Sequence, residues 1–344
     1  ALDPLHEPVH RHLMQLYAQA GQRAAALRQY QECVRTLEAE LGLPPSEETT
    51  SLYEQIRTGP TDREEPHFPA PRPRHNLPAQ PTPFVGRKHE LAEIKARLSE
   101  PDCRLLTVVG PGGIGKTRLA LQAAADFVSE AQPDHFEHGV YFVSLAPLQS
   151  VDAIVPTVAA AVGFSFYGRG EPRQQLLDYA RQKSILLIMD NFEHLLDGVG
   201  LVTDILKTAP DLKILSTSRA RLKVQGECLF LMAGMDLPPL PFPEAGRGAG
   251  GEGQYSAVEL FLQSARRAQP DFELTADNLT HVSTICRLVQ GMPLGILLAA
   301  AWVGVLTPAE IAAEISKSLD FLETDWRDVP ERQRSIRAAF DHSW

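Results

Sequence analysis

The sequence predicts an α/β protein built on a doubly wound parallel sheet, and two observations predict it. Four apolar runs of strand length, at 105–109, 140–145, 184–190 and 213–218, alternate with segments long enough to form helices. The first run is followed by a glycine-rich turn at 110–117 and then by a helix-prone stretch. Continuous apolar runs are typical of parallel strands, which are buried on both faces. In such sheets a ligand binds beyond the carboxyl ends of the strands.

A segment with the helical period precedes this core. Within residues 7–57 apolar side chains recur every three or four positions, and breaks near Gly21 and Pro44 separate three predicted helices. The apolar face predicted for the first helix carries Val9, Leu13, Leu16 and Tyr17. The helix-turn-helix unit is about 34 residues long, which fits a tetratricopeptide-like repeat. We expect this helical-repeat segment, 1–58, to continue a stack that begins upstream and to bind protein partners.

Two segments rich in proline and glycine divide the chain. Residues 59–83 have almost no apolar periodicity and are predicted to form an extended, proline-rich linker. Residues 238–254 are predicted to form a flexible loop. The predicted nucleotide-binding α/β domain lies between them, at 84–237.

The turn GPGGIGKT is a phosphate-binding P-loop in its proper setting between a strand and a helix. Glycines let successive backbone N–H groups point at a polyphosphate, and the helix N-terminus adds partial positive charge. Lys116 is expected to reach the β- and γ-phosphates, and the Thr117 hydroxyl to bind the Mg²⁺ ion that bridges them. The expected cofactor-binding residues of this loop are Gly110, Gly112, Gly113, Ile114, Gly115, Lys116, Thr117 and Arg118.

Asp190 ends the apolar run 184–190, where a Walker B aspartate would hold the Mg²⁺ shell together with Thr117. An aspartate at the start of a strand-to-helix loop is also commonplace. The Walker B interpretation of Asp190 therefore depends on the P-loop upstream. The next residue is Asn191, where many P-loop ATPases have a second acid. An amide cannot accept a proton, so general-base help would come from Glu193, from another residue, or from none. We therefore expect slow or no ATP hydrolysis, at a rate on the order of 10⁻⁴ to 10⁻² s⁻¹.

Five ordered motifs resemble the STAND class of signal-transduction ATPases, in its NB-ARC branch. They are TPFVGRKHEL at 82–91, GPGGIGKT at 110–117, LLIMDNFEHLL at 186–196, ILSTSRARL at 214–222 and GMPLGILLAA at 291–300. Before them, the stretch LMQLYAQAGQRAAALRQYQECVRTLEAELGLPPSEET resembles the end of the bacterial transcriptional activator domain. The full prediction is thus an α/β P-loop NTPase with the helical-repeat segment before it and an all-α helical subdomain after it.

The resemblance also implies the parts that follow the α/β domain and the roles of single residues. It implies a helical subdomain at 255–325 and the start of a truncated winged-helix subdomain at 326–344. By the same resemblance, Arg219 would be a sensor facing the γ-phosphate, and Pro293 would close over the base or ribose. The adenine-side segment would be formed by Phe84, Val85, Gly86 and Arg87.

Each of these roles has a plainer alternative. Arg219 could be a solvated surface charge, and Gly291 to Pro293 an ordinary helix break. Glu193 and His194 could be a helix first-turn charge and a packing histidine, rather than a catalytic pair. The candidate catalytic residues are accordingly Asp190, Arg219 and Glu193.

Composition excludes several classes of function. Lysine plus arginine number 33 against 43 acidic residues, and the formal net charge of −10 argues against a large nucleic-acid surface. Contact with DNA is thus expected only through regions outside this chain. An apolar run of membrane-spanning length and a signal peptide are both absent from the sequence, which predicts a cytoplasmic protein without membrane contact. The 4 cysteines lack CxxC spacing, so neither a zinc site nor a disulfide framework is indicated.

Together these observations predict a molecular switch that binds ATP or ADP with Mg²⁺ in a bacterial, transcriptional regulator. Nucleotide would act through domain rearrangement or self-association. One alternative is a turnover ATPase or phosphotransferase, which would need an acceptor pocket and a faster rate. A second alternative is an interaction scaffold with a degenerate nucleotide site, which Lys116→Ala would leave unaffected. The sequence has no guanine-reading NKxD motif, which favours adenine.

Overall fold

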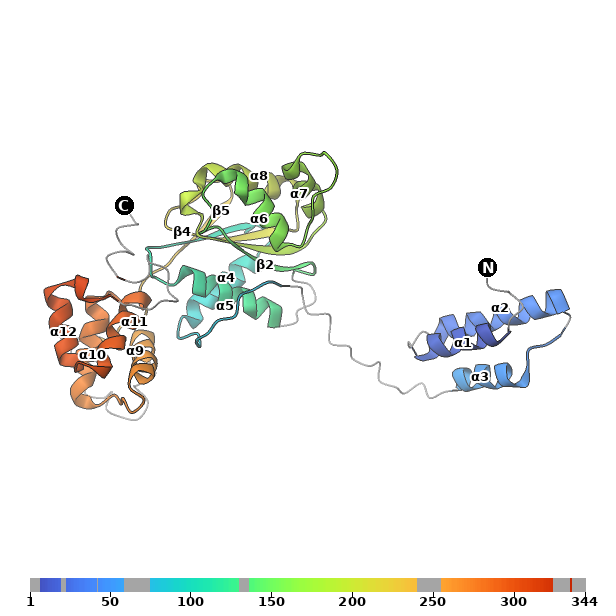
Figure 1. Cartoon of the computed structure of the whole chain (residues 1–344), viewed down its shortest axis with the longest axis horizontal. Coiled ribbons are helices and arrows are strands. Elements are labelled where there is room, and N and C mark those ends of the chain that lie inside the picture. The colour runs from blue at the N-terminus through green and yellow to red at the C-terminus, as the bar shows by residue number, and fades with distance from the viewer. Residues whose placement is uncertain are drawn as a thin grey trace. The chain divides into compact units, whose positions relative to one another are not determined.

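The structure is a computed structural model that describes residues 7–19, 23–41, 43–58, 75–129, 136–239, 255–323 and Ser335. It divides into two compact units, Ala1–Pro69 and Ala70–Trp344 (Figure 1). The predicted start of a winged-helix subdomain at 326–344 lies outside the described residues apart from Ser335. Most of the predicted linker at 59–83 and most of the predicted loop at 238–254 lie outside them too. Among the described residues, no helix is long and apolar enough to span a membrane.

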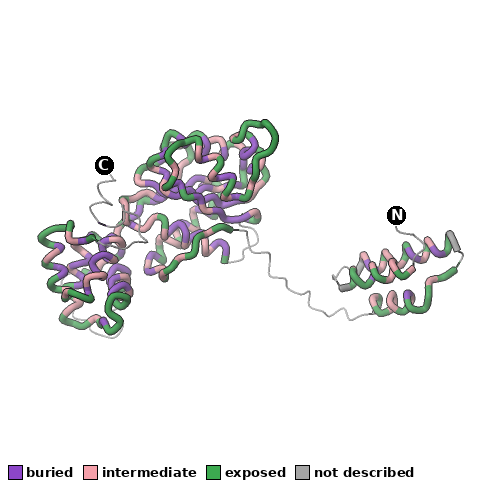
Figure 2. Tube along the Cα trace, in the orientation of Figure 1, coloured by how far each residue is buried: buried purple, intermediate pink, exposed green. Residues whose placement is uncertain are grey.

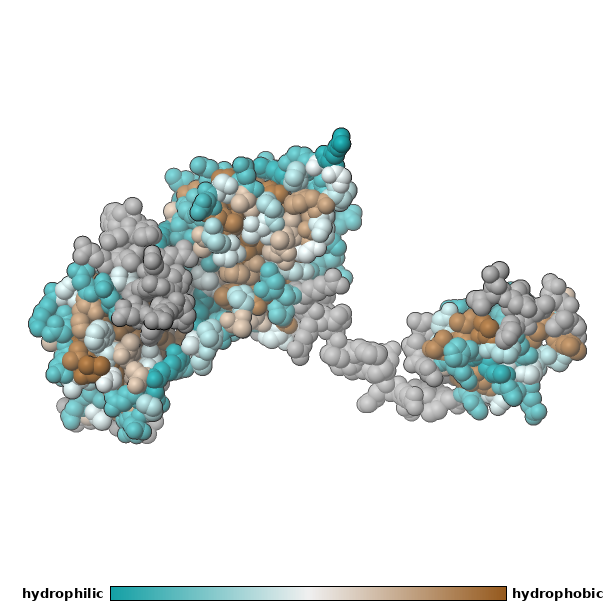
Figure 3. Space-filling model, in the orientation of Figure 1, coloured by the Kyte–Doolittle hydropathy of each residue, from teal (hydrophilic) through white to brown (hydrophobic). Residues whose placement is uncertain are grey.

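The described part of the first unit is helical. Its helices are α1 (Glu7–Gln19), α2 (Arg23–Leu41) and α3 (Glu47–Thr58). The rings of Tyr30 and Tyr53 stack between α2 and α3 with their centroids 4.0 Å apart. The predicted inner face of α1 is wrong at Leu16, which is 47% exposed, whereas Met14 is fully buried. The reason is that α1 packs on α2 and α3 through the side that carries Met14. Hydrophobic residues are visible at the surface of this unit in Figure 3.

The second unit contains a five-stranded parallel sheet with the strand order β2-β3-β4-β1-β5. The strands are β1 (Leu105–Val109), β2 (Gly139–Ser144), β3 (Ile185–Asp190), β4 (Lys213–Ser218) and β5 (Glu227–Leu231). The first four coincide with the predicted apolar runs. The fifth was not predicted, because it is an edge strand that starts with Glu227 and ends with the 74%-exposed Leu231. An edge strand need not be apolar along its whole length.

Helices cover both faces of the sheet, as a doubly wound fold requires. They are α4 (Lys88–Ser99), α5 (Lys116–Ser129), α6 (Ile154–Ala161), α7 (Pro172–Ala180) and α8 (Val199–Thr208). Helices α4 and α5 lie on one face and α6, α7 and α8 on the other (Figure 1). The inner strand β3 shows the alternation: Leu187 and Met189 join the core under α6 to α8, whereas Leu186 and Ile188 join the core under α4 and α5. Both cores appear as the buried centre of Figure 2.

An all-α subdomain follows the sheet. Its helices are α9 (Ser256–Ala268), α10 (Ala276–Leu288), α11 (Pro293–Ala301) and α12 (Pro308–Lys317). Capping boxes at Thr275 and Thr307 begin α10 and α12. The core of this subdomain also takes in Val85, which precedes α4, and Met235, which follows β5. The helical subdomain therefore packs directly against the two segments that border the P-loop.

Candidate nucleotide-binding site

The P-loop connects the end of β1 to the start of α5. Its path uses left-handed backbone at Gly113 (φ +76°) and Gly115 (φ +93°), which glycine adopts without steric cost. Helix α5 begins at Lys116, so its first backbone N–H groups face the loop. The Lys116 ammonium donates to the carbonyls of Gly110 and Pro111 at 2.8 and 3.0 Å. The ammonium is therefore folded back over its own loop.

Asp190 lies beside the P-loop at the carboxyl end of β3. Its Oδ1 accepts hydrogen bonds from the Thr117 hydroxyl at 2.7 Å and from the Thr217 hydroxyl at 2.6 Å. The carboxyl is only 7% exposed, and burial raises its pKa while the two hydroxyl donors oppose that rise. Hydroxyl and carboxylate oxygens are the donors that Mg²⁺ prefers, so the Thr117–Asp190 pair fits that ion. Sequence reasoning missed Thr217, although it lies inside the ILSTSRARL motif.

Arg219 and Glu193 form an ion pair next to Asp190. The Arg219 Nε lies 3.2 Å from the Glu193 Oε1, and the two side chains are 17% and 19% exposed. Arg219 is therefore largely shielded, which argues against the solvated surface charge. The second oxygen of Glu193, Oε2, is buried and has no hydrogen-bond partner among the described residues. The charge of Glu193 also raises the pKa of Asp190.

Asn191 forms a tight backbone turn after β3. It adopts left-handed backbone (φ +65°), and its N–H donates to the Thr217 hydroxyl at 2.9 Å. Its side-chain amide donates to the His194 Nδ1 at 3.2 Å, and the His194 Nε2 then donates to the Leu148 carbonyl at 3.1 Å. Both ring nitrogens of His194 are thus used within the fold, which favours the packing interpretation of this histidine.

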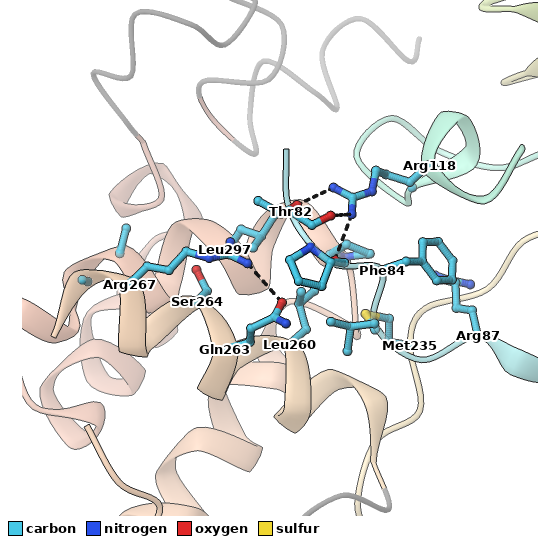
Figure 4. A pocket seen from close by; sticks show the side chains of 16 residues that line it. Thr82, Phe84, Arg87, Arg118, Met235, Leu260, Gln263, Ser264, Arg267 and Leu297 are labelled. Atoms are coloured by element: carbon cyan, nitrogen blue, oxygen red, sulfur yellow. Dashed lines mark hydrogen bonds between the residues drawn. The ribbon is translucent and has the colours of Figure 1, made fainter. Parts of the chain in front are cut away.

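The segment predicted to lie on the adenine side lines a cavity of about 410 Å³ between the sheet domain and helices α9 and α11 (Figure 4). Phe84 and Val85 form one wall, Leu260 and Leu297 come from the helices, and Gly115 opens the cavity toward the P-loop. A cavity of this size and apolar lining suits a small organic ligand. The contributions of α9 were missed by sequence reasoning because they belong to no motif and follow only the helical period.

Gly86 and Arg87 hold the wall formed by Phe84 and Val85 in place. Gly86 has φ +67°, and a Cβ there would lie 2.3 Å from the Ser256 Cβ, so only glycine fits. Arg87 is 5% exposed. Its Nη2 donates to the Ile114 and Ala233 carbonyls at 3.2 and 3.0 Å. Arg87 therefore fastens the segment to the P-loop.

Pro293 begins α11 and lines the same cavity. The turn before it joins the sheet domain, since the Met235 N–H donates to the Gly291 carbonyl at 2.8 Å. The next residue, Leu294, donates its N–H to the Gly113 carbonyl of the P-loop at 3.2 Å. The motif GMP is thus a joint between two domains, rather than only a break between two helices.

Two family models match separate parts of the chain. Residues 1–57 match the model of the bacterial transcriptional activator domain, and residues 100–233 match an AAA domain. These matches establish an activator domain followed by a P-loop domain. The finer assignments, to the NB-ARC branch and to tetratricopeptide-like repeats, stay predictions.

Curated relatives match most of this chain, and two of the three described here are named as regulators. An uncharacterised protein of Mycobacterium tuberculosis is 34% identical over 244 residues, 71% of this chain and 56% of the relative. Another M. tuberculosis protein, provisionally named an HTH-type transcriptional regulator, is 34% identical over 241 residues, 70% of this chain and 25% of the relative. The regulatory protein AfsR of Streptomyces griseus is 28% identical over 242 residues, 64% of this chain and 24% of AfsR. The match therefore spans between about a quarter and just over half of these relatives.

Solved structures with a similar path include a STAND protein with a tetratricopeptide repeat sensor from Pyrococcus horikoshii. It is 17% identical, with a TM-score of 0.42, over 70% of this chain and 33% of that protein.

Proposed function

We propose that this chain, in which a bacterial transcriptional activator domain precedes a P-loop NTPase domain, is the nucleotide-responsive part of a transcriptional regulator. It binds ATP or ADP with Mg²⁺ and hydrolyses ATP slowly or not at all. DNA is contacted only through regions outside this chain, because its formal net charge of −10 disfavours a large nucleic-acid surface. The protein partners are reached through the helical segment 1–58.

One observation carries the proposal: the phosphate site and the apolar cavity are continuous at Gly115. This residue lines the cavity, and the next residue, Lys116, opens the helix that would receive phosphates. A ligand with a flat apolar group at one end and phosphates at the other fits this arrangement. Thr117 and Asp190 supply oxygen donors for the Mg²⁺ that would neutralise part of the phosphate charge.

The switching behaviour follows from which bodies touch the ligand. Phe84 and the P-loop belong to the sheet domain, whereas Pro293 belongs to the helical subdomain. A ligand that contacts both bodies stabilises the arrangement in which they are closed, and shifts the population toward it. Arg219 would report the γ-phosphate, because a guanidinium suits a terminal phosphate.

Slow turnover follows from the state of Glu193. Its Oε1 is paired with Arg219, and the residue after Asp190 is an amide. Only the second oxygen of Glu193, Oε2, is left to accept a proton from water, and that oxygen is buried. A steady-state rate above about 1 s⁻¹ for the chain, within the range of turnover kinases, would refute the switch and favour the turnover ATPase or phosphotransferase.

The first experiment identifies the nucleotide that copurifies with the chain. The protein is denatured, the released nucleotide is separated by chromatography, and Lys116→Ala is treated in parallel. We expect stoichiometric ADP or ATP from the wild type and none from the variant, since Lys116 supplies the charge nearest the phosphates.

A thermal shift decides the case in which the purified wild type carries no nucleotide. Mg·ATP at 100-fold over its Kd should then stabilise the wild type by about 2.7 kcal/mol. An empty protein without any shift in millimolar Mg·ATP would place the scaffold with a degenerate site ahead of the switch.

A further inference from the structure

A short segment, 75–85, runs along the sheet domain to the cavity, and we call it the strap. It is fixed at one end by Asn76, whose amide donates to the Phe142 carbonyl at 2.9 Å and accepts from the Phe142 N–H at 2.6 Å. It is fixed beyond its other end by Arg87, through the carbonyls of Ile114 and Ala233. The residues of the strap that line the cavity, Thr82 to Val85, lie between these two anchors.

A third anchor holds the strap at the cavity itself. The Arg118 Nη1 donates to the Thr82 hydroxyl at 2.6 Å. Its Nη2 donates to the Thr82 carbonyl at 2.7 Å and to the Pro83 carbonyl at 2.9 Å. These three bonds are drawn in Figure 4, where the guanidinium lies over Thr82. Both terminal nitrogens of Arg118 are therefore engaged with the strap.

The position of Arg118 in the sequence makes this anchor informative. It follows Thr117 on α5, so the helix that would bind phosphate also holds the wall that would face the base. We infer that Arg118 is a positioning residue, which sets the distance between the base-binding wall of the strap and the phosphate-binding loop. This inference rests on the nucleotide site proposed above.

A simple charge effect is the rival explanation. The acceptors of Arg118 on the strap are two carbonyls and a hydroxyl, all of them neutral. Burial lowers the pKa of Arg118, and Arg267 across the cavity lowers it further. The guanidinium nevertheless stays protonated at neutral pH. Arg118 thus adds positive charge beside the P-loop, and in the rival explanation it acts on phosphates through that charge alone. The geometry and the charge can be separated because lysine keeps the charge but lacks the planar fork that reaches several acceptors at once.

The test compares a ligand with a base against one without it. Binding of ADP and of inorganic tripolyphosphate, both with Mg²⁺, is measured by displacement of a fluorescent ADP analogue. The proteins are the full chain, Arg118→Ala, Arg118→Lys, Thr82→Val and Thr82→Ser. Circular dichroism checks that each variant is folded.

We expect Arg118→Ala and Arg118→Lys each to weaken ADP binding by about tenfold, as expected when hydrogen bonds to a charged group are lost. The affinity for tripolyphosphate should fall by less than the affinity for ADP in both variants, because this ligand has no base to be positioned. Thr82→Val removes one of the three bonds and should have a smaller effect, whereas Thr82→Ser keeps the hydroxyl and should match the wild type. In the Arg118→Ala background, Thr82→Val should add no further loss, because the bond is already gone.

Other results would contradict either the role of Arg118 or the proposed function. Equal losses for ADP and tripolyphosphate, with recovery in Arg118→Lys, would show that Arg118 acts on phosphates by charge and would overturn the inference. An unchanged ADP affinity in Arg118→Ala would overturn it as well. A wild type that binds neither ligand would instead overturn the proposed function, which Lys116→Ala tests independently.

Discussion

Asp190 is a buried carboxyl group whose surroundings favour its neutral form. Burial raises its pKa above the ordinary value of 3.8, and the nearby charge of Glu193 acts in the same direction. For an acid with a raised pKa in the folded chain, the stabilising contribution is full below 3.8 and is lost as the pH rises through the folded pKa. At neutral pH the ionised Asp190 therefore costs stability, and a bound Mg²⁺ would offset that cost.

The first prediction follows for Asp190→Asn. Asparagine keeps an oxygen for the hydroxyls of Thr117 and Thr217 but cannot ionise, so the variant should melt at a higher temperature than the wild type at pH 7 in EDTA. The difference should shrink toward pH 4. In Mg·ADP the order should reverse, because the variant lacks the anionic ligand for the metal. Thermal melts across this pH range measure it, and a variant that is less stable at every pH would contradict the assigned direction.

Single residues also show where sequence reasoning ends. The spacing of the P-loop and the apolar run before Asp190 was enough to predict that Thr117 and Asp190 meet at the strand ends. Thr217 was not predicted, because a threonine inside a buried strand carries no pattern of its own. Arg118 was predicted to contact the nucleotide, yet the hydrogen bonds of its terminal nitrogens end on the strap. A long flexible side chain can reach many acceptors, and only the packed structure selects among them.

At the scale of elements, the joint between β5 and α11 is a contact between two backbones. A Cβ at Gly234 would lie 2.1 Å from the Gln290 carbonyl oxygen, and one at Gly291 would lie 2.6 Å from the Met235 carbonyl oxygen. Neither neighbour is a flexible side chain that could move aside. The absence of a side chain at Gly234 and Gly291 therefore allows the helical subdomain to pack beside the P-loop.

The second prediction concerns this joint. Gly234→Ala should destabilise the second unit by about 1–3 kcal/mol, the usual cost of local backbone strain, and should weaken nucleotide binding because Pro293 is displaced. Gly304→Ala is the matched control, since a Cβ there would meet only the Ala268 carbonyl at 3.6 Å. Chemical denaturation and ADP titration of both variants test the idea. Equal stability of the two variants would show that the joint can open without cost.

Elements differ in how far the sequence predicts them. The four apolar runs, the edge strand β2 among them, were predicted because burial on both faces demands unbroken hydrophobicity. The edge strand β5 escaped prediction, since one of its sides faces solvent and its residues are mixed. The helical subdomain was expected from motifs alone, and its capping boxes at Thr275 and Thr307 are signals that a residue-by-residue scan could have found.

At the scale of the whole molecule, the chain carries separate cores in its two compact units. The first unit buries Met14, Cys33 and Leu37, whereas the second has its own clusters around the sheet and the helical subdomain. Units with separate cores unfold separately unless their interface couples them.

The third prediction follows from these separate cores. Calorimetry should show two unfolding transitions, and ADP with Mg²⁺ should raise only one of them. In Lys116→Ala both transitions should remain, and neither should respond to ADP. A single transition that shifts as a whole would instead show that the activator domain and the nucleotide site are thermodynamically coupled within this chain.

The family matches at 1–57 and 100–233 agree with the predicted order of an activator segment before a P-loop domain, but the positions of boundaries were harder to predict. Proline-rich composition marks where packing stops, yet residues 75–83 of the predicted linker are bound to the sheet domain. A single asparagine and one arginine are enough to fix such a segment. Composition averages over a window and cannot see two anchoring contacts within it.

The strap is held mostly through its backbone, and this has a consequence for its tolerance of substitution. The Asn76 side chain bonds the backbone N–H and carbonyl of Phe142 in β2. Arg87 and Arg118 donate largely to main-chain carbonyls. Apart from the Arg118 bond to the Thr82 hydroxyl, these anchors do not depend on the side chains of the residues they hold. Apart from Thr82, the residues between the anchors can therefore be replaced without loss of a hydrogen bond to an anchor, so substitutions there should be tolerated better than substitutions at Asn76, Arg87 or Arg118.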